Sequence, residues 1–248
     1  MKRHGLLLCL LVLMLQAMAQ KTDYTRLITQ GVTYTGRTLA HADGSVSFDW
    51  IGVYAQTDFT GGTIAVDMSS TRPCYFNVFI DGEWTQKIFA DSLSHQRIVL
   101  AEKLGKGTHR LRLQRACEGN GITTIHGFYG AKGARLKAVE RKSRMIEIFG
   151  DSYTCGYGSD SPTQNEHFKI ETENVDHAYG CLIARYFDTD YAIQAHSGQG
   201  MVRNYGDKKQ RSDYSMLDRH TKVYDNDKTV EYDFKAYRPD IVLINLGT

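Results

Sequence analysis

The 248-residue sequence predicts an N-terminal all-β jelly-roll sandwich over residues 20–140, followed by an incomplete α/β domain over residues 145–248. Before residue 140, short alternating strands are separated by Gly-rich turns and helical periodicity is almost absent, which is typical of sandwiches and jelly rolls. After Met145, strands alternate with a helical segment. These strands are nearly continuous apolar runs, which favours a parallel sheet covered on both faces.

Residues 1–19 have the order of a secretory signal peptide. Lys2 and Arg3 precede an apolar run from Leu6 to Leu15, and Ala17-Met18-Ala19 matches the small-x-small pattern of a cleavage site. The apolar run is too short to span a bilayer comfortably. We therefore expect cleavage after Ala19 and a secreted or periplasmic protein without a membrane partner.

The sandwich is predicted from alternating apolar and polar residues. Its clearest signal is a hairpin that turns at Asp81-Gly82, because Asp-Gly is a strong two-residue turn between alternating segments. Strands are expected at 45–50, 62–67, 75–80, 97–100, 108–113 and 122–129. Trp50 and Trp84 lie in this part, and core or domain contacts are expected for both, with carbohydrate binding as the alternative.

The α/β part begins after a charged stretch at 137–144. Strands are expected at 145–149, 190–196 and 240–246, and a helix at 177–187. Three strands are too few for a stable doubly wound domain. A central last strand would also leave an apolar edge open to pairing. We therefore expect the sequence to be a fragment of a longer chain.

Composition excludes several classes of function. Lys and Arg total 30 against 28 Asp and Glu, so electrostatics offer no case for nucleic-acid binding. No phosphate loop, nucleotide fingerprint or metal-binding cluster is present, so no cofactor and no metal are expected. Beyond the leader, four cysteines allow three disulfide pairings, and the sequence does not choose between them: Cys74, Cys117, Cys155 and Cys181.

Each predicted parallel strand ends in a glycine-bearing loop. The first loop is Gly150-Asp151-Ser152, the second includes Gly198, and the third begins at Gly247. Ligands of open parallel sheets bind beyond the carboxyl ends of the strands. A serine that opens a helix there has an exposed hydroxyl and a backbone N–H able to stabilise an oxyanion. The plainer interpretation is that Asp151 or Ser152 only caps a helix.

These residues resemble the SGNH (GDSL) hydrolases, which have a flavodoxin-like parallel sheet. The longer string from Gly150 to Gly158, together with 196–205 and 177–180, looks like carbohydrate esterase family 2, the acetyl-xylan esterases. That family also places a jelly roll before the hydrolase domain. The resemblance implies that Ser152 attacks the acetyl carbonyl and that the N–H groups of Ser152 and Gly198 bind the oxyanion. Asp151, Gly150 and Gly247 would support the site.

The same resemblance implies that a third oxyanion donor, an asparagine, and the histidine base lie beyond Thr248. A serine hydroxyl is a poor nucleophile without a base, so these 248 residues alone are expected to have little or no esterase activity. His196 is the best internal candidate for the base, although a structural histidine is the more ordinary interpretation. His177 is expected to pack or bond near the helix start.

Aromatic residues near the expected crevice suggest the substrate. Tyr153, Tyr157 and Tyr205 are candidates for stacking on sugars, although core packing is the more ordinary role of a tyrosine. The expected function is therefore a secreted esterase that removes O-acetyl groups from plant cell-wall polysaccharide of the xylan type. Two alternatives remain: a carbohydrate-binding protein with a non-catalytic hydrolase-like domain, and an esterase acting on another O-acetyl sugar or a lipid ester.

Overall fold

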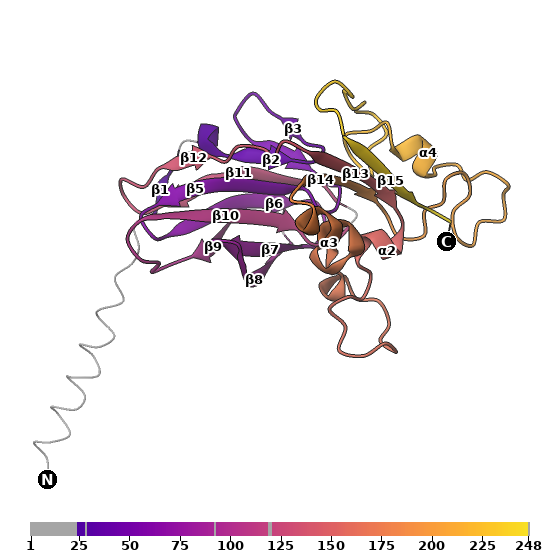
Figure 1. Cartoon of the computed structure of the whole chain (residues 1–248), viewed down its shortest axis with the longest axis horizontal. Helices are drawn as coiled ribbons and strands as arrows, with labels where there is room; N and C mark the ends of the chain where they lie inside the picture. Colours follow the sequence, from indigo (N-terminus) through magenta and orange to yellow (C-terminus); the bar gives the residue numbers. More distant parts are fainter. Residues whose placement is uncertain (1–23, 28, 92, 119–120, 248) are drawn as a thin grey trace, which may run out of the picture.

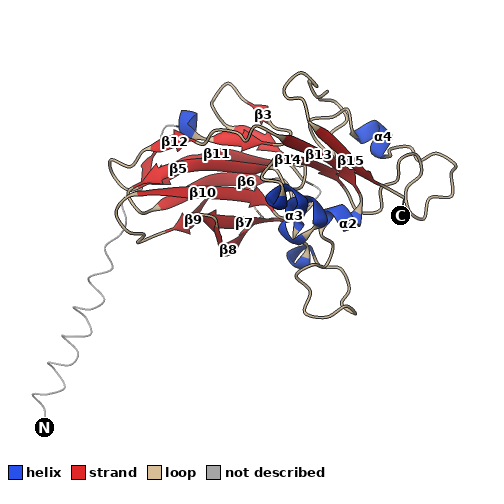
Figure 2. Cartoon of the chain, viewed as in Figure 1, coloured by secondary structure: helices blue, strands red, loops and turns tan. Residues whose placement is uncertain are grey.

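The computed structural model describes residues 24–27, 29–91, 93–118 and 121–247. The predicted signal peptide and Thr248 lie outside the described residues. Two antiparallel sheets fill the left of Figure 1, and a smaller parallel sheet lies to their right. Figure 2 shows that α2, α3 and α4 gather around this smaller sheet. Among the described residues, no helix is long and apolar enough to cross a membrane.

The first antiparallel sheet has the order β3-β4-β11-β6-β9, with β1 added beside β11. Its strands are β1 (Thr25–Arg26), β3 (Leu39–Ala40), β4 (Val46–Phe48), β6 (Ile64–Ser70), β9 (Gln96–Ala101) and β11 (Thr123–Gly130). The second sheet has the order β12-β5-β10-β7-β8, with β2 beside β5. Its strands are β2 (Thr33–Thr35), β5 (Tyr54–Thr60), β7 (Cys74–Ile80), β8 (Glu83–Ala90), β10 (Thr108–Arg115) and β12 (Leu136–Ala138). A 3₁₀ turn, η1 (Thr29–Gly31), lies between β1 and β2.

The two sheets share one apolar core. Phe59, Phe76 and Phe128 are fully buried there together with Trp50. The predicted hairpin is confirmed, since β7 and β8 pair antiparallel around Asp81 and Gly82, which both have positive φ angles of 54° and 93°. The expected core position is correct for Trp50. The core half of the expectation is wrong for Trp84, which is 55% exposed on β8 and donates its indole N–H to Asn77 Oδ1 of β7 at 3.2 Å.

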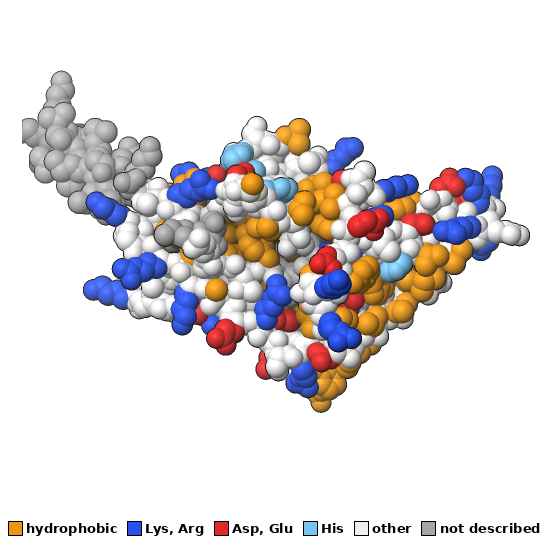
Figure 3. Space-filling view, turned by 90° about the horizontal axis from the view of Figure 1, so that it is seen from above, with side chains coloured by type: hydrophobic (Ala, Val, Ile, Leu, Met, Phe, Trp, Pro, Cys, Tyr) orange, Lys and Arg blue, Asp and Glu red, His pale blue; other side chains and the backbone are white. Residues whose placement is uncertain are grey.

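The parallel sheet has the order β14-β13-β15. Its strands are β13 (Met145–Gly150), β14 (Asp190–Ala195) and β15 (Ile241–Asn245), and β13 pairs in parallel with both neighbours. The strand at the centre of this sheet is therefore β13, not the last strand. On β15, Ile241, Val242 and Ile244 are exposed. Figure 3 shows hydrophobic side chains gathered along the right-hand margin, on the side where Figure 1 places this sheet.

The short helices follow the strand ends. They are α2 (Ser152–Cys155), η2 (Ile170–Thr172), η3 (Val175–His177), α3 (Tyr179–Tyr186) and α4 (Met216–Arg219). The prediction of one helix from residue 177 is wrong at its start. Ala178 has an extended backbone (φ −75°, ψ 156°), so it separates the 3₁₀ turn η3 from α3. At Gly180, an added Cβ would lie 2.7 Å from Ile148 Cδ1, which shows how closely α3 packs on β13.

Buried polar contacts join the sandwich to the parallel sheet. The fully buried Arg37, between β2 and β3, donates to Glu147 Oε1 of β13 at 3.1 Å and to the Lys222 carbonyl at 2.9 Å. On the other side, Gln114 of β10 donates to the Tyr191 hydroxyl of β14 at 2.6 Å. These contacts hold the two parts in one arrangement, because breaking them would leave buried polar groups unpaired.

The four cysteines are buried thiols in the structure. Cys74 and Cys117 face each other with their sulfur atoms 3.5 Å apart. Cys181 instead accepts a hydrogen bond from Gln114 Nε2 at 3.6 Å. The structure therefore brings one pair of the four together.

Candidate active site

Ser152 lies at the carboxyl end of β13, as the first residue of α2. Asp151 is the N-cap, and its Oδ1 accepts the Tyr153 N–H at 3.1 Å. Gly150 is required by packing, since an added Cβ would lie 1.8 Å from Thr154 Oγ1. Asp151 therefore caps the helix, as the plainer interpretation held. The cap also presents the half-buried Ser152 at the start of α2, where Asp151 accepts the N–H groups of Tyr153, Thr154 and Cys155.

Ser152 lines a cavity of about 640 Å³. The cavity is also lined by Tyr153, Gly156, Tyr157, Ser159, His177, Ala178, Tyr179 and Asn245. Sequence reasoning did not single out Asn245, the last residue of β15, which pairs with Gly150. The sequence feature that could have identified Asn245 is a polar residue at the end of an otherwise apolar strand. The cavity thus places a hydroxyl, an amide, an imidazole and aromatic rings around one space.

The loop after β14 lies beside the Ser152 loop at the same sheet edge. His196 N–H donates to the Gly150 carbonyl at 3.3 Å, directly before Asp151. Gly198 follows with φ of 75°, a conformation that favours glycine. Its carbonyl accepts the Tyr205 N–H at 2.8 Å. Neighbouring loops for Ser152 and Gly198 are therefore confirmed, whereas the oxyanion role of the Gly198 N–H stays a prediction.

The third loop begins at Gly247, which has φ of 140°. An added Cβ there would meet nothing within 4 Å, so the backbone conformation alone favours glycine. Since β15 pairs in parallel with β13, this loop leaves the same sheet edge as the Ser152 loop.

The predicted sugar-stacking tyrosines are all exposed. Tyr153 and Tyr205 are 75% and 76% exposed, and Tyr157 is 48% exposed. The alternative of core packing is therefore wrong for these three residues. Tyr157 stacks on Phe168, with ring centroids 4.4 Å apart, so one aromatic face at the cavity is already held in place.

The two histidines considered from the sequence have different surroundings. His177 ends η3, is largely exposed, and places Nδ1 3.0 Å from Asp160 Oδ1. His196 is mostly buried, and its Nδ1 lies 2.5 Å from Asp225 Oδ2. His177 lines the cavity with Ser152, whereas the structural interpretation of His196 agrees with its buried ion pair.

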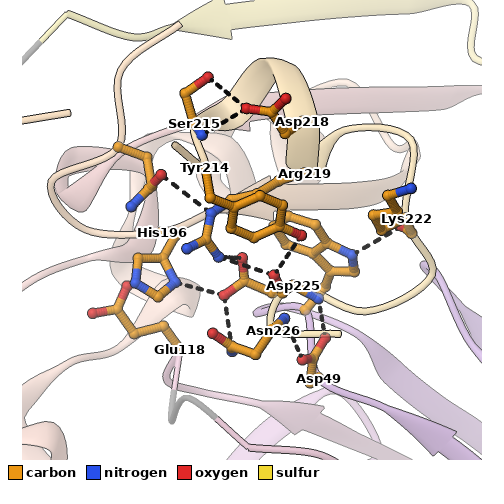
Figure 4. Close-up of polar contacts among 12 residues, drawn as sticks. Asp49, Glu118, His196, Tyr214, Ser215, Asp218, Arg219, Lys222, Asp225 and Asn226 are labelled. Carbon is orange, nitrogen blue, oxygen red and sulfur yellow. Dashed lines mark hydrogen bonds and ion pairs between the residues drawn. The ribbon is translucent and has the colours of Figure 1, made fainter. Parts of the chain in front are cut away.

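Asp225 is the centre of a buried polar network that sequence reasoning missed (Figure 4). Its carboxylate pairs with His196 and with Arg219 of α4. Arg219 also donates to Gln199 Oε1 at 3.1 Å, in the Gly198 loop. Asp49 of the sandwich accepts the N–H groups of Asp225 and Asn226 at 2.5 and 3.0 Å. No local sequence pattern joins Asp49, the loop after β14 and the 219–226 stretch, because these three segments are far apart in the sequence.

Burial and pairing shift the pKa values of this network in opposite directions. Burial alone would lower the pKa of His196, but the charge and hydrogen bond of Asp225 raise it above its ordinary value. Burial alone would raise the pKa of Asp225, and His196 with Arg219 lowers it. Burial and the Asp225 charge raise the pKa of Asp49 to about 6. The pairing therefore favours the protonated imidazole of His196 and the ionised carboxylate of Asp225, next to the Gly198 loop.

A second buried cluster contains Glu118, Cys155 and Glu173, with one potential metal-ligand atom of each within 4.8 Å of the others. Burial and the Glu118 charge raise the pKa of Glu173 to about 9, and burial raises the pKa of the Cys155 thiol well above its ordinary value. Metal binding requires deprotonated ligands. A protonated thiol and a protonated carboxyl suit hydrogen bonding better than a cation, so the expectation of no metal stays a prediction.

Comparisons with known proteins agree on one family. The model of the carbohydrate esterase 2 N-terminal domain matches residues 34–139. An acetylxylan esterase / glucomannan deacetylase of Cellvibrio japonicus is 31% identical over 257 residues, covering 100% of this chain and 68% of the relative. The cellulase/esterase CelE of Acetivibrio thermocellus is 29% identical over 221 residues, covering 88% of this chain and 26% of that protein.

A solved structure extends the likeness to the fold. A family two carbohydrate esterase from Clostridium thermocellum, solved in complex with cellohexaose, matches with a TM-score of 0.81 at 27% identity. The match covers 88% of this chain and 66% of that structure. The chain thus spans about two thirds of the Cellvibrio relative and of this solved structure, and about a quarter of CelE.

Proposed function

The chain belongs to carbohydrate esterase family 2, and we propose that it carries the nucleophile of a secreted serine esterase that removes O-acetyl groups from plant cell-wall polysaccharide of the xylan type. Ser152 Oγ attacks the acetyl carbonyl, and the N–H groups of Ser152 and Gly198 bind the oxyanion. The general base takes the Ser152 proton and gives it to the departing sugar oxygen, and water then cleaves the acetyl-serine ester, which releases acetate and restores the Ser152 hydroxyl. No cofactor is needed for this acyl transfer.

The observation that carries the proposal is the position of Ser152. Its hydroxyl lies at the start of a capped helix and lines a cavity of about 640 Å³ that also has Tyr153, Tyr157 and Asn245 on its walls. A concave site with aromatic rings and a few polar groups suits a sugar ring carrying a small ester. The printed names of the relatives, which include acetylxylan esterase and glucomannan deacetylase, support polysaccharide as the substrate class.

Two finer assignments belong to the same proposal. The jelly-roll topology is supported by strand order, because β4, β6, β9 and β11 lie in one sheet and β5, β7, β8 and β10 in the other. Secretion is supported by the leader-like order of residues 1–19. The mass of the exported protein tests the second, since cleavage after Ala19 predicts Gln20 as the first residue.

The general base is the open part of the proposal. His177 lines the cavity with Ser152 and is held by Asp160 at 3.0 Å, whereas His196 is paired with Asp225. We keep the prediction that these 248 residues alone have little or no activity. Full activity that disappears in His177→Gln would instead assign the base to this chain.

The proposal is tested with Ser152→Ala. Acetate release from acetylated xylan and glucomannan, and hydrolysis of 4-nitrophenyl acetate, are measured for the natural protein containing this chain and for the variant. We expect the variant to lose at least about a thousandfold in kcat, because the acyl-enzyme is not formed. The wild-type rate with Ser152→Ala would refute the proposal. A preference for long acyl esters would replace polysaccharide with lipid as the substrate.

A second candidate is carbohydrate binding without catalysis, favoured by the exposed stacked pair Tyr157 and Phe168. Oligosaccharide titration separates the two functions. A silent binder would bind xylo- or cello-oligosaccharide equally with and without the Ser152 hydroxyl and would release no acetate in either form.

A further inference from the structure

Glu118 connects the sandwich to both loops of the proposed active site. It follows β10 by three residues and is 6% exposed. Its Oε2 accepts the Ser197 N–H at 2.6 Å, one residue before Gly198. The same oxygen accepts the Cys155 thiol at 3.6 Å, from the last residue of α2, which begins at Ser152. One carboxylate oxygen is therefore shared by the nucleophile helix and the Gly198 loop.

The backbone of Glu118 is itself held from the opposite side. Its N–H donates to Glu173 Oε2 at 2.9 Å. Nearby, the Val175 N–H donates to the Ala116 carbonyl at 3.0 Å. Arg115 also fixes this backbone, because its fully buried guanidinium donates to the carbonyls of Cys117 and Glu118 at 3.1 and 2.8 Å. The carboxylate therefore projects from a fixed backbone.

The Gly198 loop depends on such support because of its own conformation. Gly198 has a positive φ, and the Ser197 hydroxyl is buried without a hydrogen-bond partner in the part of the chain that the structure describes. Hydrogen bonds from backbone N–H groups to a carboxylate are short and roughly twice as strong as neutral ones. Losing the acceptor would leave the Ser197 N–H buried and unpaired, which favours a different loop conformation.

We propose that Glu118 is a positioning residue, through which the sandwich sets the conformation of the Ser197–Gly198 loop relative to Ser152. Figure 4 shows its carboxylate beside His196, at the base of this loop. Only the expected effect of Glu118 on catalysis rests on the proposed function. Through Glu118, the sandwich affects the reaction by holding the Ser197–Gly198 loop. Glu118 itself does not contact the substrate.

The test compares Glu118→Ala and Glu118→Gln with the parent and with Glu83→Ala, an exposed glutamate at the start of β8. Alanine removes the acceptor, whereas glutamine keeps an acceptor oxygen of similar reach. Hydrogen exchange of the Ser197 and Gly198 amides, followed by NMR, and kcat and KM for 4-nitrophenyl acetate are all measured in the natural protein that contains this chain.

We expect Glu118→Ala to exchange the Ser197 amide at least about tenfold faster, while strand amides of the sandwich keep their protection. Its kcat should fall about ten- to a hundredfold with little change in KM, because a displaced oxyanion donor acts in the transition state. Glu118→Gln should recover most of both values, and Glu83→Ala should match the parent.

Three results would overturn the inference: unchanged Ser197 exchange in Glu118→Ala, faster exchange with unchanged kcat, or a glutamine variant as impaired as alanine. Failure of the proposed function is recognised separately. In that case the parent has no Ser152-dependent hydrolysis, and the exchange rates still decide whether Glu118 holds the loop.

Discussion

Removing the charge of Asp225 should destabilise the protein more than most single substitutions. The side chain is 2% exposed and pairs with the His196 imidazole at 2.5 Å and with the Arg219 guanidinium. It also accepts the Asn226 side-chain amide at 3.2 Å. Asp225→Asn keeps the side-chain volume but leaves the buried guanidinium of Arg219 without its counter-charge. The loss of stability therefore measures the lost charge pairing and not the creation of a cavity.

The magnitude follows from the cost of breaking a buried ion pair. Removing one partner costs about 3–5 kcal/mol, because the other charge stays buried. For a chain of this size, each kcal/mol lowers Tm by about 2–4 °C, which gives a fall of about 6–20 °C. The matched control is Asp213→Asn, whose pair with Lys209 is exposed on both sides and should contribute less than about 1 kcal/mol.

The assay is thermal and urea unfolding followed by circular dichroism, at neutral pH. A loss below about 1 kcal/mol in Asp225→Asn, equal to that of the control, would refute the reasoning. Such a result would mean that solvent or a rearranged side chain compensates the cations, and that the network in Figure 4 is not a fixed unit.

The pH dependence gives the same prediction a second readout. The pKa of His196 is raised in the folded state, so its contribution is fully present below about pH 6.5 and is lost as pH rises through the folded pKa. The pKa of Asp225 is lowered, so its contribution is present above about pH 3.9 and is lost as pH falls through the folded value. The difference between parent and Asp225→Asn should therefore be largest between about pH 4 and 6.5.

Two further predictions concern residues beside the nucleophile. Gly150→Ala should lower stability by about 1–3 kcal/mol and slow Ser152-dependent hydrolysis, because the new Cβ would lie 1.8 Å from Thr154 Oγ1 and shift α2. Unfolding curves matching those of Gly105→Ala, where an added Cβ meets nothing within 4 Å, would contradict this. Glu173→Gln should gain stability over the parent as pH rises from 6 to 8, by at least about 1 kcal/mol. The folded pKa of Glu173 is raised to about 9, so the parent loses stability as pH rises from about 4.3 towards that value, and glutamine does not. Parallel pH–stability curves for the two proteins, with exposed Glu171→Gln as the control, would disprove it.

Local sequence pattern determined much of the architecture. The Asp81-Gly82 turn carries its own backbone preference, and period-two alternation marks which strand faces are buried, so the hairpin of β7 and β8 was predictable. The nearly continuous apolar strands after Met145 likewise favoured a parallel sheet, which β13, β14 and β15 form. The expected cover on both faces does not extend to β15, where Ile241, Val242 and Ile244 are exposed. The start of α3 was harder to predict from the sequence. Helical periodicity includes His177, whereas the extended backbone at Ala178 separates the 3₁₀ turn η3 from α3.

The site divides in the same way. Ser152 and Gly198 could be singled out from the sequence by itself, because glycine-bearing loops at the ends of parallel strands meet at one edge of a sheet. Only the tertiary structure brought Glu118 to Ser197 and Asp49 to Asp225, which are 79 and 176 residues apart in the sequence. Strands and turns can be predicted from the sequence because they reflect local preferences of the backbone. The partners of buried charges depend on how distant segments pack, so the spacing of residues along the chain does not identify them.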